Sequence, residues 1–413
     1  MASEWKITSL KEAGVQLLDC DHRTPVPVQE GYPYIAIPQM KGGRLDFAEA
    51  RRISTDDFID WTKKTLPQKG DIVLSRRCNP GETAYVGDNT QFALGQNLVL
   101  LRADERRVLP EFLRWAVRGV EWWMEIQKYL NVGAVFDSLR CNDIPSFRML
   151  VPPIEQQWAI AHILGTLDDK IELNRKMNET LEAMARALFQ SWFVDFDPVR
   201  AKAEGRPTGL PDSIAALFPD SFQNSELGPI PTGWTVGRLD DLFVLQRGFD
   251  LPTPNRIPGN FPVVAASGPS GTHNQFTVRG PGVTTGRSGV LGKVFFVHED
   301  FWPLNTSLWI KEFKQSRPAY AFYLLRLLNF ELFNAGSAVP TLNRNHVHGL
   351  PMLLPSMELI DKFEFHAFGM LKRQRANDVE SSTLACVRDG LLPKLISGEI
   401  RVKEAAQLVE AAL

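Results

Sequence analysis

Residues 151–174 read VPPIEQQWAIAHILGTLDDKIELN, and they lead into a stretch, 154–193, that contains no proline and a single glycine, Gly165. The paired prolines at 152–153 suit the first turn of a helix, where a missing backbone N–H costs nothing. Apolar residues and two asparagines then recur at alternating spacings of three and four, which is typical of a heptad seam. The pattern predicts a helix over residues 153–196 with a seam formed by Leu164, Leu167, Ile171, Asn174, Asn178, Leu181, Ala185, Leu188 and Trp192.

A second long helix is predicted over residues 355–398. Ser397-Gly398 closes it, because glycine commonly follows the last turn of a helix. Pro393 falls in the last turns and can kink the end. Forty residues of helix span about 60 Å, and two such helices separated by a whole domain can pack antiparallel. The apolar face of the second helix consists of Ile360, Met370, Leu371, Leu384, Leu391 and Leu395.

The two helices follow two copies of one sequence plan. The end of the first copy matches the end of the second at a constant offset of 203 residues (342 − 139 = 203), whereas the opening tryptophans, Trp5 and Trp234, differ by 229. The second copy is therefore the more compact. The pairs at the offset of 203 are Leu139 and Leu342, Asn142 and Asn345, Pro152 and Pro355, and Glu155 and Glu358.

The same offset relates Asn174 to Asn377, and both lie near the midpoint of their helices. If the helices pair antiparallel, the midpoints meet, so we expect these asparagines to approach each other and to fix the register. A buried polar pair of this kind fixes register at some cost in stability. The alternative is that one or both face solvent.

Each copy begins with short β-branched, aromatic or leucine-rich strands, followed by helical stretches over residues 110–129 and 318–333. The sequence thus predicts an α+β fold with a pseudo-two-fold internal repeat, in which two α/β domains are separated by two long antiparallel helices that form a coiled coil. Residues 197–228 are rich in proline and glycine and predict an extended connector that packs on a surface. The predicted boundaries are 1–152 and 229–354 for the domains, 153–196 and 355–398 for the helices, 197–228 for the connector and 399–413 for a C-terminal tail.

The formal net charge of the 413 residues is −2, which argues mildly against nucleic acid for the chain as a whole. Residues 251–298, however, contain no aspartate or glutamate. Such a stretch makes a local positive surface of the kind that phosphate contact needs. The alternative is a loop-rich domain edge that lacks acids by chance. The candidate DNA contacts in the second copy are Arg256, His273, Arg279, Arg287, Ser288, Lys293 and Arg344.

The first copy has weaker equivalents in two loops that follow predicted strands. Arginine can recognise guanine with two hydrogen bonds, and asparagine can do the same with adenine. For any single arginine the alternative is a solvated surface charge. The candidates here are Lys41, Arg44, Arg76, Arg77 and Asn79.

Several kinds of site are missing from the sequence. It has no Asn/Asp-Pro-Pro-aromatic motif of an amino-group methyltransferase, no P-loop, no assignable catalytic set and no cysteine spacing typical of zinc. The four cysteines are expected to be buried or half-buried free thiols. The start lacks a secretory pattern and no apolar run approaches the roughly 20 residues of a membrane span, so we expect a cytoplasmic protein without a membrane partner. The alternatives to a binding protein are an enzyme with hidden catalysis and a coiled-coil adaptor.

The chain resembles the specificity subunits of Type I restriction-modification systems over about residues 1–400. The motifs that carry the resemblance are residues 151–157 with 160–174, LFQSWFVDF at 188–196, GPIPTGW at 228–234 and LLPKLISGEI at 391–400. Met357–Lys362 departs from the pattern, because it lacks the Glu-Gln-Gln of the first helix.

The resemblance implies two target-recognition domains, each reading one half of a split, asymmetric site in double-stranded DNA, and two helices that act as a ruler for the unread spacer. It also implies two modification subunits that methylate adenine with S-adenosylmethionine, and restriction subunits that use ATP and Mg²⁺. By that resemblance this chain carries no cofactor and no catalytic residue, and its specificity serves partner subunits.

Overall fold

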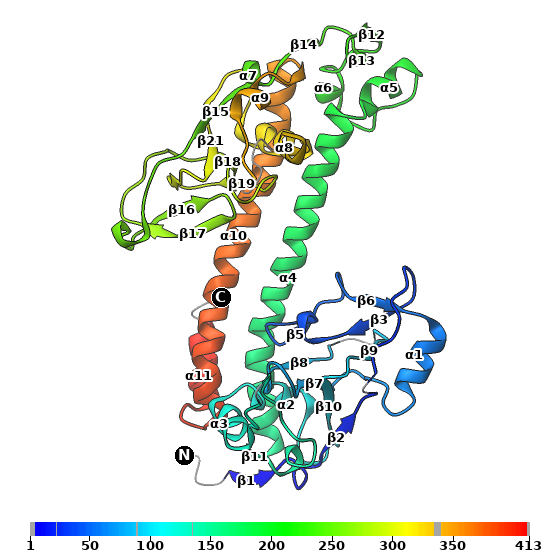
Figure 1. Ribbon diagram of the computed structural model, residues 1–413, viewed down its shortest axis with the longest axis vertical. Helices are drawn as coiled ribbons and strands as arrows, with labels where there is room; N and C mark the ends of the chain where they lie inside the picture. Colours follow the sequence, from blue (N-terminus) through cyan, green and yellow to red (C-terminus); the bar gives the residue numbers. More distant parts are fainter. Residues whose placement is uncertain (1–4, 22, 88–89, 134, 334–339, 411–413) are drawn as a thin grey trace. The chain divides into compact units, whose positions relative to one another are not determined.

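The computed structural model describes residues 5–21, 23–87, 90–133, 135–333 and 340–410 (Figure 1). Parts of the predicted domains and tail, at 1–4, 22, 88–89, 134, 334–339 and 411–413, lie outside the described residues. The chain forms two compact units. Unit 1 comprises residues 1–172 and 380–413, and unit 2 comprises residues 173–379.

The recognition domain of unit 1 is built on a four-stranded antiparallel sheet in the order β2-β10-β7-β8 and a three-stranded sheet in the order β6-β3-β9. Strands β3 and β9 run parallel, and a two-stranded ribbon, β1-β11, joins the start of the domain to its end. The strands are β1 (Lys6–Ser9), β2 (Val15–Asp19), β3 (Tyr32–Ile35), β6 (Arg51–Ile53), β7 (Ile72–Ser75), β8 (Thr83–Tyr85), β9 (Ala93–Leu94), β10 (Leu98–Ala103) and β11 (Arg148–Val151).

The domain in unit 2 repeats this topology. Its sheets have the orders β15-β21-β18-β19 and β17-β16-β20, β16 runs parallel to β20, and a β14-β22 ribbon joins start to end. The strands are β14 (Thr235–Arg238), β15 (Phe243–Arg247), β16 (Phe261–Ala265), β17 (Gly268–His273), β18 (Gly282–Gly286), β19 (Val294–Val297), β20 (Trp302–Pro303), β21 (Ser307–Phe313) and β22 (Pro351–Leu354). The predicted internal repeat is confirmed in the two larger sheets and the ribbon of each domain.

The register of the paired strands locates the shortening of the second copy. Ile35 pairs with Leu94 and Val264 pairs with Pro303, so the offset falls from 229 (264 − 35) to 209 (303 − 94). Between these positions unit 1 carries helix α1 (Thr55–Thr62) and a hairpin of β4 (Met40–Lys41) and β5 (Arg44–Leu45). The hairpin turns at residues 42–43, two glycines with positive φ, a geometry that glycine adopts without strain.

The helical stretches predicted over 110–129 and 318–333 are each broken in two. In unit 1 the break falls at Gly119, whose extended conformation starts a new helix. In unit 2 Leu328 leaves the helical region in the same way. The resulting elements are α2 (Pro110–Ala116), α3 (Val120–Tyr129), α8 (Pro318–Leu327) and the 3₁₀ helix η5 (Phe330–Phe333); shorter ones are η2 (Ile37–Gln39), η3 (Ile144–Ser146), α7 (Leu239–Leu242), η4 (Thr253–Asn255) and α9 (Arg344–His348).

The two long helices are α4 (Ile154–Phe193) and α10 (Met357–Ile396), each of 40 residues, and they pack together. Within unit 2, contacts of Asn174 with Asn377 and of Asn178 with Gln374 run in opposite chain directions, so the helices are antiparallel as predicted. Pro393 lies inside α10, which continues to Ile396. Gly398, with a φ of 73°, follows the helix end.

The prediction of an extended connector without regular structure is wrong. Residues 197–228 contain two short helices and, near residue 228, the first strand of a hairpin. Pro198 lies in the first turn of the first helix, where proline costs no hydrogen bond, so it starts the helix instead of breaking it. Phe218 is buried and Leu210 packs on the core of unit 2, which confirms that the segment covers a surface. The elements are α5 (Asp197–Ala203), α6 (Asp212–Ala215), β12 (Phe222–Ser225) and β13 (Gly228–Pro231).

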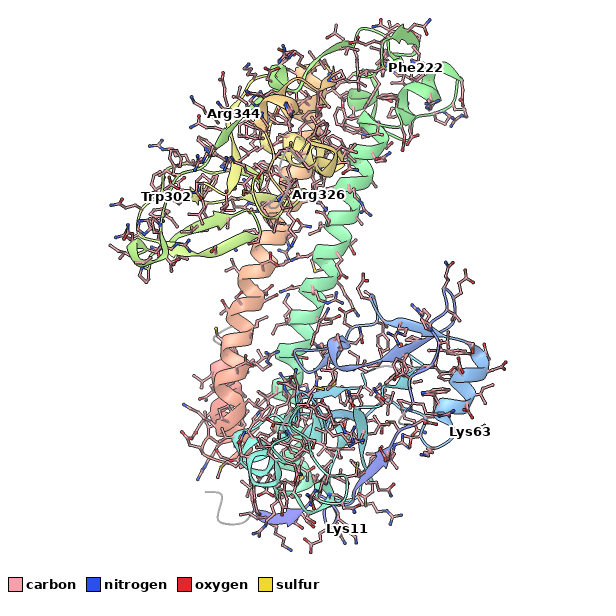
Figure 2. The ribbon with its side chains drawn as sticks, in the orientation of Figure 1. Lys11, Lys63, Phe222, Trp302, Arg326 and Arg344 are labelled. Carbon is pink, nitrogen blue, oxygen red and sulfur yellow. The ribbon has the colours of Figure 1, made fainter. Side chains whose placement is uncertain are left out.

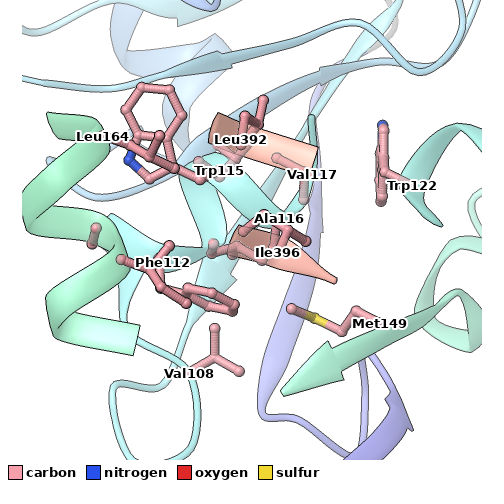
Figure 3. Packing of buried hydrophobic residues seen from close by; sticks show 14 of the residues in the cluster. Val108, Phe112, Trp115, Ala116, Val117, Trp122, Met149, Leu164, Leu392 and Ile396 are labelled. Atoms are coloured by element: carbon pink, nitrogen blue, oxygen red, sulfur yellow. The ribbon is translucent and has the colours of Figure 1, made fainter. Parts of the chain in front are cut away.

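Each core joins a recognition domain to one end of both long helices. In unit 1, Phe112 and Trp115 of α2 pack with Leu164 of α4 and with Leu392 and Ile396 of α10 (Figure 3). The tail helix α11 (Val402–Glu410) adds Ala405 and Val409 to the same core. The corresponding core of unit 2 contains Phe189, Trp192, Phe193, Tyr320 and Phe363. Within the described residues, no helix combines the length and apolar character needed to cross a membrane.

Candidate nucleic-acid interface

An arginine follows the central strand of each recognition domain and is held by the same backbone hydrogen bonds. In unit 1 the N–H of Arg76 donates to Asn97 O (3.0 Å), and Arg76 O accepts from the N–H of Leu139 (2.8 Å). In unit 2 the N–H of Arg287 donates to Thr306 O (2.8 Å), and Arg287 O accepts from the N–H of Leu342 (2.8 Å). These bonds tie the strand end to two other segments, and we call this arrangement the arginine frame.

The frame extends two residues further in both domains. The N–H of Cys78 donates to Asp137 O (3.3 Å), and the N–H of Gly289 donates to Pro340 O (2.9 Å). Both residues have positive φ, 66° and 88°. Cys78 is therefore a non-glycine residue in a conformation that glycine adopts without strain. Loops 75–81 and 284–289 therefore occupy similar places in the two copies.

The loop candidates of the first domain have different surroundings. Arg76 is buried, and its contact with DNA stays a prediction. Arg77 is half-buried and Asn79 is exposed. Lys41 pairs with Asp46 across the β4–β5 hairpin at 2.7 Å. Arg44 contacts Asp168 of α4, so the alternative of a solvated surface charge does not describe it, and its contact with DNA stays a prediction.

Three candidates of the second domain are held by internal bonds. Arg256 Nη1 donates to Ser270 O at 2.7 Å, and Arg287 Nη1 donates to Asn305 O at 3.2 Å. His273 is buried, and its Nδ1 lies 3.1 Å from the backbone nitrogen of Ile257; its contact with DNA stays a prediction.

The remaining candidates of the second domain lie at the surface. Arg279, Lys293 and Arg344 are exposed, and Ser288 is half-buried; Arg344 opens α9 and is labelled in Figure 2. Among the described residues none of the three cations forms an ion pair. Their contact with DNA stays a prediction.

A hollow with a mostly apolar lining lies beside the arginine frame of the first domain. It has a volume of about 390 Å³ and is lined in part by Gln39, Arg51, Gln96 and Asn97. Asn97 also supplies the carbonyl that holds Arg76. Amide side chains of this kind can recognise adenine.

Comparison with known proteins gives the family. The profile described as "Type I restriction modification DNA specificity domain" matches residues 26–183 and 231–364, which together are more than half of the chain. The chain belongs to the family of Type I restriction-modification specificity subunits. The profile matches twice, once in each of the two copies that the topology defines.

Two curated specificity subunits align along most of their length. The specificity subunit of the Type I restriction enzyme HindI of Haemophilus influenzae is 27% identical over 83% of this chain and 89% of the relative. That of the enzyme MjaIX of Methanocaldococcus jannaschii is 26% identical over 90% of each. A crystal structure of the specificity subunit from M. genitalium, 16% identical, has the same fold, with a TM-score of 0.65 over 95% of this chain and 96% of that one.

The predicted asparagine contact of this specificity subunit is confirmed. Asn174 and Asn377 are both buried, and Asn174 Nδ2 donates to Asn377 O at 3.4 Å. Asn377 Nδ2 donates in turn to Asn178 Oδ1 at 2.8 Å, and Gln374 Nε2 donates to Asn178 O at 2.9 Å. The alternative, that the pair faces solvent, is excluded. The hydrogen bond from Gln374 was not predicted, because Gln374 is not one of the residues that the sequence pattern assigned to the helix contact.

The sequence analysis missed a buried charge cluster in unit 1. Asp168 of α4 contacts Arg44 of β5, Arg114 of α2 and Arg388 of α10. Burial alone would raise the pKa of Asp168, but the guanidinium charges of Arg114, Arg44 and Arg388 outweigh burial and hold the pKa below its usual range. The available signal was the spacing, because Asp168 lies four residues after Leu164 and so on the apolar side of the helix.

A side chain from each long helix also holds the first turn of a recognition-domain helix. In unit 1 the buried Gln157 accepts from the N–H of Leu109 at 2.9 Å, before α2. In unit 2 Glu364 accepts from the N–H groups of Ala319 (2.8 Å) and Tyr320 (3.1 Å) at the start of α8. These N–H groups have no partner inside their helix, so the side chains satisfy them.

Unit 2 has a further link between α8 and α4. Glu182 of α4 pairs with Arg326 of α8, which is labelled in Figure 2, and accepts from the hydroxyl of Tyr323 at 3.1 Å. Together with Glu364, this pair connects the recognition domain of unit 2 to both long helices.

The thiols and possible metal ligands offer no further site. Cys20 is buried and Cys141 is half-buried, as expected, but Cys78 and Cys386 are exposed, which corrects the prediction for these two. All four are free. In the described parts of the chain, no group of three or more His, Cys, Asp or Glu side chains is arranged to hold a metal ion.

Proposed function

We propose that each recognition domain reads one half of a bipartite, asymmetric site in double-stranded DNA, and that the α4–α10 helix pair sets the length of the unread spacer. The observation that carries this proposal is the arginine frame, which occurs once in each domain with different residues around it. A repeated frame presents two reading surfaces built alike, and different side chains on it give the two halves different sequences.

The length of the helix pair is compatible with this spacing role. A 40-residue helix is about 60 Å long, and two targets on one face of a duplex lie about 34 Å apart per helical turn. In unit 1, Arg44 and Arg114 of the recognition domain contact Asp168 of α4. In unit 2, Glu364 and Glu182 of the long helices hold α8. These contacts anchor each recognition domain to the helices. A change in helix length would therefore be passed on to the reading surfaces.

We further propose that this chain carries out no chemistry and directs that of partner subunits. Two modification subunits would methylate adenine with S-adenosylmethionine, and restriction subunits would use ATP and Mg²⁺. The complex would act on DNA in the cytoplasm. Support comes from the two relatives from Haemophilus influenzae and Methanocaldococcus jannaschii, which are specificity subunits of Type I restriction enzymes.

The test is to sequence the methylated DNA of a host that carries this chain with its modification subunit. A two-part adenine-methylated motif with a fixed gap is expected, and a continuous motif would contradict the proposal. The purified chain, incubated with DNA, S-adenosylmethionine and Mg²⁺, should show no methylation or cleavage of the DNA. Turnover in this experiment would mean that the chain is itself an enzyme. Salt-dependent DNA binding, with and without the modification subunit, separates it from an adaptor.

A further inference from the structure

The two arginine frames differ at the residue that follows the framed arginine. Arg77 occupies this position in the first domain and Ser288 in the second. Arg77 bridges to Ser138 and Ser288 bridges to Thr341, and these partners stand 203 residues apart (341 − 138). The backbone around the position is therefore the same in both domains, whereas the side chain is not.

Arg77 differs from Arg44 and Arg76, the other candidate arginines of its domain. Its guanidinium carbon lies 5.9 Å from the centroid of the Phe136 ring, a cation–π distance. With the described residues Arg77 forms no ion pair, whereas Arg44 contacts Asp168 and Arg76 is buried. The ring orients the planar guanidinium and leaves its N–H donors available.

The loop beside Arg77 has an apolar surface. Backbone hydrogen bonds between Asn131 and Ser138 close it, and Val132, Val135 and Phe136 are 82%, 89% and 44% exposed. Base edges in the major groove include the thymine methyl group, which apolar side chains contact, whereas phosphates offer no such surface. An available guanidinium over the Phe136 ring, next to a loop with an apolar surface, is therefore suited to base edges.

We propose that Arg77 is a specificity-determining residue of the first recognition domain, which donates to O6 and N7 of a guanine in its half-site. Ser288 is its counterpart in the second domain. The inference rests on the proposed function, that the first domain reads one half of the site.

The test uses the full chain co-produced with its modification subunit, with sequencing of the methylated DNA as the readout. Arg77→Ser gives the first domain the residue of the second. We expect the preference for guanine at one position of one half-site to fall about 10- to 100-fold, with the other half-site and the gap unchanged. Arg106→Ser removes an exposed arginine of the same domain and should leave the motif intact.

A second variant covers the case in which Arg77→Ser reduces all methylation. Arg77→Gln should move the preference at the same position from guanine to adenine, because glutamine pairs with adenine N6 and N7. Equal weakening on every sequence, with a smaller dependence on salt, would mean a phosphate contact and overturn the inference, as would unchanged motifs in both variants. A wild-type complex without a two-part motif would refute the proposed function itself, whatever Arg77 does.

Discussion

Asp168 brings together three arginines that are far apart in the sequence, and its carboxylate is only 3% exposed. Replacing it with asparagine would leave the guanidinium groups of Arg114 and Arg388, 10% and 12% exposed, without their shared negative partner. We expect Asp168→Asn to lower the free energy of unfolding of unit 1 by about 3–5 kcal/mol, as measured by urea denaturation. The neighbouring Asp169 is 78% exposed, so Asp169→Asn is the matched control, and a similar loss there would contradict this account.

The lowered pKa of Asp168 also fixes the direction of a pH effect. Because its pKa is lower in the folded than in the unfolded chain, the ionised carboxylate stabilises the fold above its unfolded pKa of about 3.9. That contribution is lost as the pH falls through the folded pKa. Urea midpoints measured between pH 6 and pH 3 should therefore decline less in Asp168→Asn than in the wild type, and parallel declines would contradict the assignment.

Among the elements, the attachment of α8 to α10 through Glu364 has the opposite pH dependence. Burial raises the pKa of Glu364 above its usual range, although the N–H groups of Ala319 and Tyr320 oppose the shift. A group with a raised folded pKa loses its stabilising contribution as the pH rises through that pKa. Glu364→Gln keeps an acceptor for α8 but cannot ionise, so the thermal stability of unit 2 should depend less on pH between 4 and 7 than in the wild type. If the melting temperatures of the variant and the wild type changed equally with pH, this role of Glu364 would be refuted.

The asparagines at the midpoint of the helix pair should behave as one energetic unit. Asn178→Leu or Asn377→Leu alone removes the side-chain bond between Asn377 Nδ2 and Asn178 Oδ1 and leaves the other amide with fewer partners, at a cost of about 1–3 kcal/mol. The double variant removes both amides, so its loss should be smaller than the sum of the single losses by about 0.5–3 kcal/mol. Unfolding free energies of the four proteins measure this coupling, and additive losses would show that the two residues do not cooperate.

The elements also show what the sequence could predict and what it could not. The long helices were placed to within a few residues. In the first, a heptad pattern repeats over nine seam positions and averages out single exceptions, and in the second Ser397-Gly398 marks the end. The connector was mispredicted, because Pro198 and Gly205 signal a helix start and a helix end as readily as a loop. The Asp168 cluster could not be foreseen, because its arginines come from three elements whose proximity depends on the folded domain. For the same reason, loop residues such as Arg76 and Arg77 could not be separated into buried and available.

At the scale of the whole molecule, the length of α4 should decide the gap in the recognised DNA and nothing else about the motif. Four extra residues in α4 lengthen it by about 6 Å and add roughly 40° of rotation beyond a full turn. We therefore expect methylated-DNA sequencing to show a changed gap between unchanged half-sites. Four residues inserted after Gly209, in the exposed part of the connector, are the matched control and should leave the gap as it was. Altered half-site bases with an unaltered gap would mean that the helices shape the reading surfaces and do not set their separation.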